Sequence, residues 1–116
     1  MSLRKLSIND IANLEPLNGT PPDTQLRLLW RPDGNLPLAS VWGVIDVGAE
    51  VSCSIESHGE VIYVVEGSLE ITGPNEKLIL HSGEILFVPA TGNKSDKVTY
   101  KALDKTRAFS IECAKI

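Results

Sequence analysis

The feature that most constrains the fold of this chain is a succession of short apolar runs, each closed by turn-forming residues. From Gln25 onward, Gly, Pro, Asn and Asp stand at the joints between the runs, and no window has the sustained period of an amphipathic helix. Strands at this spacing indicate an antiparallel sandwich or barrel. The expected strands cover residues 25–30, 37–45, 51–55, 60–65, 68–72, 77–80, 84–88, 97–102 and 107–114.

The first residues differ from this pattern and predict a short N-terminal arm, residues 1–24, ahead of a barrel that spans residues 25–116. A turn of helix is expected at residues 7–14, with Ser7 as its N-cap, before the turn formers LNGTPPD. At 116 residues the chain has room for one domain with one hydrophobic core. The sequence therefore predicts an all-β fold with a single barrel.

The expected strands differ in how many of their faces are apolar. Residues 68–72 alternate, so one face is apolar, whereas residues 61–65 and 85–88 are apolar on both faces. Strands of the second kind need a cover on their outer face, which the N-terminal arm or a second copy of the chain would supply. We therefore expect a homodimer.

Composition and charge argue against several classes of partner and location. The net charge is −4 and Lys and Arg occur singly, so no basic stripe for nucleic acid is present. No apolar run approaches the roughly 20 residues that cross a bilayer, so no membrane partner is expected. The N-terminus lacks the apolar segment of a secretory signal, and the two cysteines are too few for a disulfide scaffold. The expected location is the cytoplasm.

Two segments carry spacings that are typical of one superfamily. Glu60 and Gly67 have the spacing E-x6-G, and Gly83 and Pro89 have the spacing G-x5-P. Over residues 40–113 this pattern resembles the two motifs of the cupin superfamily, the RmlC-like proteins. The resemblance implies an antiparallel jelly-roll barrel. Both glycines stand at tight turns, where a positive φ is expected.

Within the superfamily, two groups are similar to particular stretches of the chain. The run SHGEVIYVVEGSLEI resembles the ethanolamine-utilisation cupins. The same run, together with PPDTQLRLLW ahead of the barrel, is similar to the C-terminal cupin domain of type I mannose-6-phosphate isomerases. Neither resemblance implies a particular substrate.

The metal-binding positions that the resemblance implies are mostly replaced. The H-x-H pair would fall at Cys53 and Ile55 or one residue later, Glu60 would be the third ligand, and the last histidine would fall near Ser95. A single carboxylate cannot hold a transition metal, which needs three or four protein ligands. We therefore expect a degenerate metal site and no cofactor. Zinc held by Cys53, His58 and Glu60 is the one alternative.

The surroundings of His58 permit two interpretations. If the chain stays extended, Glu56, His58 and Glu60 face one side and could act together as acid and base. If residues 57–59 form a turn instead, His58 is exposed and takes no part. The polar run and its glycine favour the turn.

Four further residues are candidates for a ligand pocket. Cys53 stands at the family's first histidine position, and Tyr63 lies in a central strand, where an aromatic residue is more often part of the core. A phosphorylated ligand would need a cation inside the barrel, for which Arg27 and Arg31 are the candidates.

Glu60 is the strongest candidate for a functional residue. It opens a strand whose next five residues are apolar, which places its carboxylate at the edge of a low-dielectric interior. Such a charge is either paired, with Arg27 or Lys94 as partners, or has a raised pKa in an open cavity.

The sequence leaves three hypotheses about function and does not decide whether the protein is an enzyme. The first is a barrel that binds a small polar ligand, a carbohydrate or a carboxylate, at its mouth. The second is an isomerase or epimerase of a sugar or sugar phosphate that uses Glu60 with His58, Tyr63 or Cys53 for acid–base chemistry. The third is a structural module that forms dimers.

Overall fold

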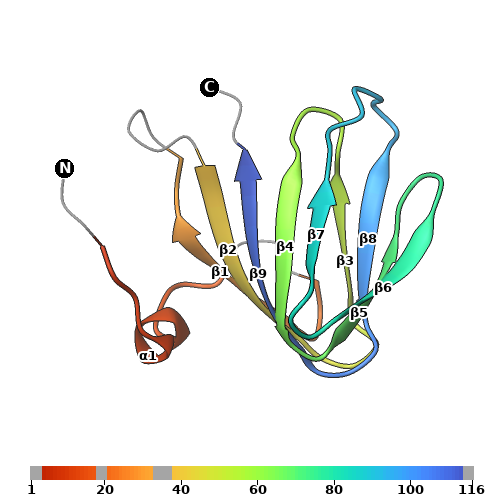
Figure 1. Cartoon of the computed structure of the whole chain (residues 1–116). Coiled ribbons are helices and arrows are strands. Elements are labelled where there is room, and N and C mark those ends of the chain that lie inside the picture. The colour runs from red at the N-terminus through yellow and green to blue at the C-terminus, as the bar shows by residue number, and fades with distance from the viewer. Residues whose placement is uncertain (1–3, 18–20, 33–37, 114–116) are drawn as a thin grey trace.

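The chain folds into two facing antiparallel sheets, as the computed structural model in Figure 1 shows. The structure describes residues 4–17, 21–32 and 38–113, and these contain one short helix and nine strands. In this part of the chain no helix is long and apolar enough to cross a membrane. The elements are α1 (Ile8–Ala12), β1 (Thr24–Trp30), β2 (Leu38–Ile45), β3 (Glu50–Ser54), β4 (Glu60–Glu66), β5 (Ser68–Thr72), β6 (Lys77–His81), β7 (Ile85–Val88), β8 (Lys97–Ala102) and β9 (Thr106–Cys113).

Every strand pairs with its neighbours in the antiparallel sense. One sheet has the order β1-β2-β9-β4-β7 and the other has the order β3-β8-β5-β6. Their inner faces pack against each other, as in a jelly-roll barrel, and the predicted fold class is confirmed. The buried core draws on both sheets and consists of Ile45, Ile55, Ile62, Val64, Leu69, Ile71, Leu80, Val98, Tyr100, Ala102 and Ala108.

The predicted strands are all present, because apolar runs and turn formers alternate with the same period as the observed strands and loops. Two predicted ends, residues 37 and 114, lie outside the described residues.

The predicted N-terminal turn of helix is also confirmed. The Ser7 hydroxyl accepts the backbone N–H of Asp10 at 3.1 Å, and the Asp10 carboxylate accepts the backbone N–H of Ser7 at 2.8 Å. These two bonds form a capping box, which satisfies donors that the short helix leaves free.

The described part of the arm does not cover the strands that are apolar on both faces. Helix α1 contacts β1, at one edge of the five-stranded sheet, whereas β7 forms the opposite edge (Figure 1). The outward side chains of β4 and β7 therefore remain exposed in the single chain. Phe87 has 72% of its surface exposed and Ile85 has 53%.

Two glycines hold the turns on either side of the β5–β6 hairpin, and both have the expected positive φ, 93° at Gly67 and 84° at Gly83. A Cβ atom added to Gly67 would lie 2.5 Å from the Lys105 carbonyl oxygen and 2.6 Å from the Thr106 hydroxyl. A Cβ atom added to Gly83 would meet nothing within 4 Å. Gly67 is thus required for close packing as well as for conformation.

This difference predicts unequal effects of the same substitution. We expect Gly83→Ala to lower the free energy of unfolding by about 1–2 kcal/mol, the cost of a left-handed alanine. Gly67→Ala should cost roughly 3 kcal/mol or more, because backbone and a buried hydroxyl must also move. Urea unfolding of the two variants measures the difference, and equal losses would contradict the close approach at Gly67.

Candidate functional site

A cavity of about 200 Å³ lies between the two sheets. Its walls come from β1, β2, β4 and β9 of one sheet and from β3, β5 and β8 of the other, and most of the lining is apolar. Leu17 of the N-terminal arm also reaches it, since its backbone N–H donates to the Leu26 carbonyl oxygen at 2.8 Å. The lining residues are Leu17, Leu26, Val41, Gly43, Ile45, Val51, Cys53, Glu60, Ile62, Leu69, Tyr100, Ala108, Ser110 and Glu112.

Strand alternation decides which side chains enter the cavity. In β4 the even-numbered residues Glu60 and Ile62 face inward, and in β9 Ser110 and Glu112 do the same. Glu60 is the direct cross-strand partner of Glu112. Side chains in that relation have Cβ atoms about 5 Å apart, so the two carboxyl groups are close neighbours inside the barrel.

Glu60 is a buried residue, with 9% of its surface exposed. Its Oε2 accepts a hydrogen bond from the hydroxyl group of Tyr100 at 3.2 Å. Tyr100 belongs to β8 in the opposite sheet and is 3% exposed. A buried hydrogen bond therefore joins the two sheets across the cavity.

Burial and a like charge both disfavour ionisation of Glu60. Loss of water around the carboxyl group, followed by the negative charge of Glu112, raises the pKa of Glu60 from its ordinary value of 4.5 to about 7. The Tyr100 hydrogen bond opposes this change in pKa. No Arg, Lys or His is among the described residues that line the cavity. None of the ion pairs formed by the described residues includes Glu60.

Besides Glu112, two titratable groups line the cavity with Glu60, and both are held in their neutral forms. Burial, and then the charges of Glu60 and Glu112, raise the pKa of the Cys53 thiol to about 12. Burial, and then the charge of Glu60, also raise the pKa of Tyr100 above its ordinary value. At neutral pH, Cys53 is a thiol with little nucleophilic character and Tyr100 is a hydrogen-bond donor.

Of the residues proposed from the sequence, the structure brings Cys53 and Glu60 together in the cavity. His58 lies in the loop between β3 and β4, where it is exposed and its Nδ1 is 3.1 Å from the Ser57 hydroxyl. The chain is thus not extended from Glu56 to Glu60, and His58 does not face the cavity.

Tyr63 and Arg27 also lie outside the cavity. Tyr63 is on the outer face of β4 and is 38% exposed. Arg27 faces the N-terminal arm from β1, and its guanidinium group donates to the Leu14 carbonyl oxygen at 2.5 Å. The structure therefore brings neither residue next to Glu60.

Sequence reasoning missed Tyr100, Ser110 and Glu112. The signal was present, because residues 97–102 alternate and place Tyr100 on the same face as Val98 and Ala102. The last strand alternates less clearly, and its pairing with β4 was needed to place Glu112 beside Glu60.

The residues present do not fit the metal that the cupin resemblance implies. The inward positions that correspond to the H-x-H pair hold Cys53 and Ile55, and Ile55 is 3% exposed in the core. Among the described residues no group of three His, Cys, Asp or Glu side chains is arranged to hold a metal ion. The imidazole ligands that iron, zinc and nickel sites use are missing from the cavity lining.

No family model matches this chain, and no curated protein matches it in sequence. Solved structures do match it. Ectoine synthase from P. lautus is 16% identical with a TM-score of 0.76, and the match covers 98% of this chain and 80% of the synthase. An RmlC-like cupin from Shewanella frigidimarina is 19% identical with a TM-score of 0.70, over 90% of this chain and 86% of the cupin.

A third match is a putative ethanolamine utilization protein Q from Salmonella typhimurium. It is 19% identical with a TM-score of 0.65, and the match covers 79% of this chain and 71% of that protein. The chain therefore has the cupin fold, as its two motifs implied. At these identities the likeness concerns the fold and not the ligand.

The raised pKa of Glu60 predicts a pH-dependent stability with a definite sign. Between pH 4.5 and about 7 the folded state binds the Glu60 proton more tightly than the unfolded state, so the free energy of unfolding falls as pH rises. Each pH unit in this window changes it by about 1.4 kcal/mol, which gives a total loss on the order of 3 kcal/mol.

Glu60→Gln should remove this contribution, because an amide does not ionise. Measured by urea unfolding, the variant should gain stability relative to the natural chain from pH 5 to pH 8. A constant difference between the two proteins over this range would contradict a raised pKa at Glu60. Glu66→Gln, an exposed residue of the same strand, is the matched control.

Proposed function

We propose that this protein is a metal-free cupin that binds a small molecule in its barrel cavity, with Glu60 as the polar anchor. The observation that carries the proposal is a buried glutamate, Glu60, whose carboxyl group faces an apolar cavity. A buried ionisable group without a counter-ion lowers the stability of the fold, and groups of this kind are typical of functional sites.

The size and lining of the cavity favour a ligand with an apolar body. Apolar cavities of about 150 Å³ take up molecules as large as benzene, and this one has about 200 Å³. Its polar groups gather at Glu60, Tyr100, Ser110 and Glu112, so a ligand would place its polar end there. Carboxyl and carboxylate oxygens accept hydrogen bonds, and that end should therefore carry a donor.

The apolar lining and the two carboxyl groups disfavour the ligands that the sequence suggested, which were a carbohydrate, a carboxylate or a sugar phosphate. A carbohydrate would leave most of its hydroxyl groups against apolar walls without hydrogen-bond partners. A carboxylate would meet the negative charge of Glu112, and a sugar phosphate would find no cation in the described lining. A hydroxyl or amine group on a compact hydrocarbon body suits the lining best.

Acid–base catalysis at Glu60 has one observation in its favour, since a carboxyl pKa of about 7 suits proton transfer at neutral pH. Isomerisation or epimerisation usually needs a second group for the other proton. Because its pKa is raised, Tyr100 keeps its proton and only donates a hydrogen bond, and Cys53 stays a thiol. Binding is therefore the proposal that the site supports best.

Val41→Phe tests the proposal because the larger side chain would fill the cavity. We expect the natural chain to bind cyclohexanol, detected by ligand-observed NMR titration at pH 6, and Val41→Phe to bind it at least tenfold more weakly. Val65→Phe makes the same change on the outer face of β4 and should bind as the natural chain does. Equal binding by both variants would exclude the cavity as the site.

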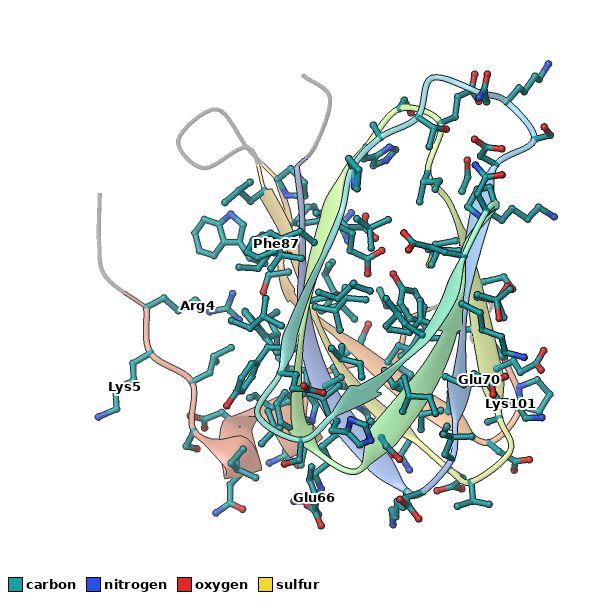
Figure 2. All side chains as sticks on the ribbon, turned by 45° about the vertical axis from the view of Figure 1, so that its right-hand side comes forward. Arg4, Lys5, Glu66, Glu70, Phe87 and Lys101 are labelled. Atoms are coloured by element: carbon teal, nitrogen blue, oxygen red, sulfur yellow. The ribbon has the colours of Figure 1, made fainter. Side chains whose placement is uncertain are left out.

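We also propose that the chain forms a symmetric dimer through the outer faces of β4 and β7. Val61 and Phe87 are cross-strand partners there, and so are Tyr63 and Ile85, which forms a continuous apolar surface. Figure 2 shows Phe87 on the outside of the molecule. A two-fold contact would bury this surface on both copies at once, which is why a second copy suits it.

Phe87→Asp should prevent this association, since two carboxylates would be buried in each dimer. We expect the natural chain to sediment as a dimer at micromolar concentration and Phe87→Asp to sediment as a monomer. Ile79→Asp, on the outer face of the other sheet, is the control and should remain dimeric. A monomeric natural chain would contradict the proposal.

A further inference from the structure

Two carboxyl groups and no cationic side chain are among the described residues that line the cavity. Glu60 and Glu112 are directly opposite on hydrogen-bonded strands, and both line the cavity. The described lining otherwise consists of apolar side chains, glycine, a serine, a thiol and the Tyr100 hydroxyl. The pair thus lacks the counter-ion that two carboxylates in a low-dielectric space require.

Glu60 is presented to the cavity with one oxygen free to bind. Tyr100 occupies Oε2, and no hydrogen bond to Oε1 is formed by the described residues. No buried polar side-chain atom in this part of the chain lacks a partner, so Oε1 is not sealed away from the open space. An incoming donor can therefore reach Oε1 from the open space that Glu60 lines.

We propose that the ligand of this cavity is a monocationic amine with a compact hydrocarbon body, whose ammonium group sits between Glu60 and Glu112. This inference rests on the proposed binding function and specifies its ligand class. An ammonium group offers three donors and one positive charge, which suits two carboxyl groups that share one negative charge or carry two. The hydrocarbon body would lie against Leu26, Val41 and Leu69.

Binding of such a ligand is an exchange of cations. At neutral pH the proton held on Glu60 partly neutralises the pair, in line with its raised pKa. When the ammonium group enters, that proton leaves for the solvent and the carboxylate takes the ammonium as its counter-ion. No covalent bond forms, and the ammonium keeps its own protons because amines of this kind have a pKa near that of lysine, about 10.4.

Of the titratable groups that face Glu60, two stay neutral during this exchange and the third, Glu112, is its partner in binding the ammonium group. From β3 the facing titratable group is Cys53, from β8 it is Tyr100, and from β9 it is Glu112. The thiol has a pKa of about 12 and the pKa of the phenol is raised, so both stay neutral through the pH range of the experiment. On the β7 side, Glu60 is paired with Val88, which carries no charge.

Three probes with the same ring test the inference: cyclohexylamine, cyclohexanol and cyclohexanecarboxylate. Isothermal titration at pH 8 should show cyclohexylamine binding at least tenfold more tightly than cyclohexanol, and no binding of cyclohexanecarboxylate. Between pH 5.5 and pH 7 the affinity for cyclohexylamine should rise, by up to tenfold per pH unit, as the proton becomes easier to displace. Repeating the titration in buffers of different ionisation enthalpy should show release of close to one proton per amine bound at pH 6.

Variants of Glu60 and Glu112 separate the contribution of the carboxyl charges to binding from that of the apolar cavity walls. Glu112→Gln and Glu60→Gln should each weaken cyclohexylamine binding at least tenfold and weaken cyclohexanol binding by a clearly smaller factor, because the amine alone loses a charge interaction. Glu66→Gln, an exposed residue at the other end of β4 (Figure 2), should change neither. The proton-release measurement uses the natural chain, so it decides the question even if a variant fails to fold.

The outcomes distinguish this inference from the proposal on which it rests. If cyclohexanol binds as tightly as cyclohexylamine, or if amine binding releases no proton, the cationic ligand is excluded while binding in the cavity stands. If none of the three probes binds, the proposed function fails as well. Preference for cyclohexanecarboxylate would overturn the inference and return the anionic ligand to consideration.

Discussion

The antiparallel pairing of β4 with β9 is the contact on which the site depends. Its register sets Glu60 opposite Glu112 and points both into the barrel. A slip of β4 by one residue would turn Glu60 to the outer face, away from Glu112, and bring Val61 inside. The shape of the cavity, its charge and the unusual pKa of Glu60 all follow from this register.

Tyr100 provides the second constraint, because its hydroxyl group reaches Glu60 from the opposite sheet. The hydrogen bond stabilises the ionised carboxyl group, whereas burial and Glu112 destabilise it, and burial has the larger effect. The result is a group that changes its charge near neutral pH inside a largely apolar space. A barrel of this fold can therefore hold a carboxyl group with a raised pKa in its interior.

The inside and the outside of the five-stranded sheet have different roles. The inner side chains of β4 and β9 form the cavity, while the outer side chains of β4 and β7 form an exposed apolar surface. The N-terminal arm occupies the far edge of the same sheet, where it holds Arg27 and contributes Leu17 to the cavity. This arrangement leaves the apolar surface open to a partner and keeps Arg27 away from Glu60.

The sequence by itself determined the strands, the positive-φ turns at Gly67 and Gly83, the N-cap at Ser7 and the burial of Glu60, because each depends on local pattern and on neighbours along the chain. Only the tertiary structure decided which polar residues accompany Glu60. Tyr100 and Glu112 lie far from Glu60 along the chain and join it through sheet pairing and sheet packing, which local pattern does not encode. His58, only two residues from Glu60, is excluded because the chain bends at Glu56 and Ser57 and His58 lies exposed in the loop before β4. Proximity along the chain was therefore a poor guide to the site, and strand register was the deciding physical factor.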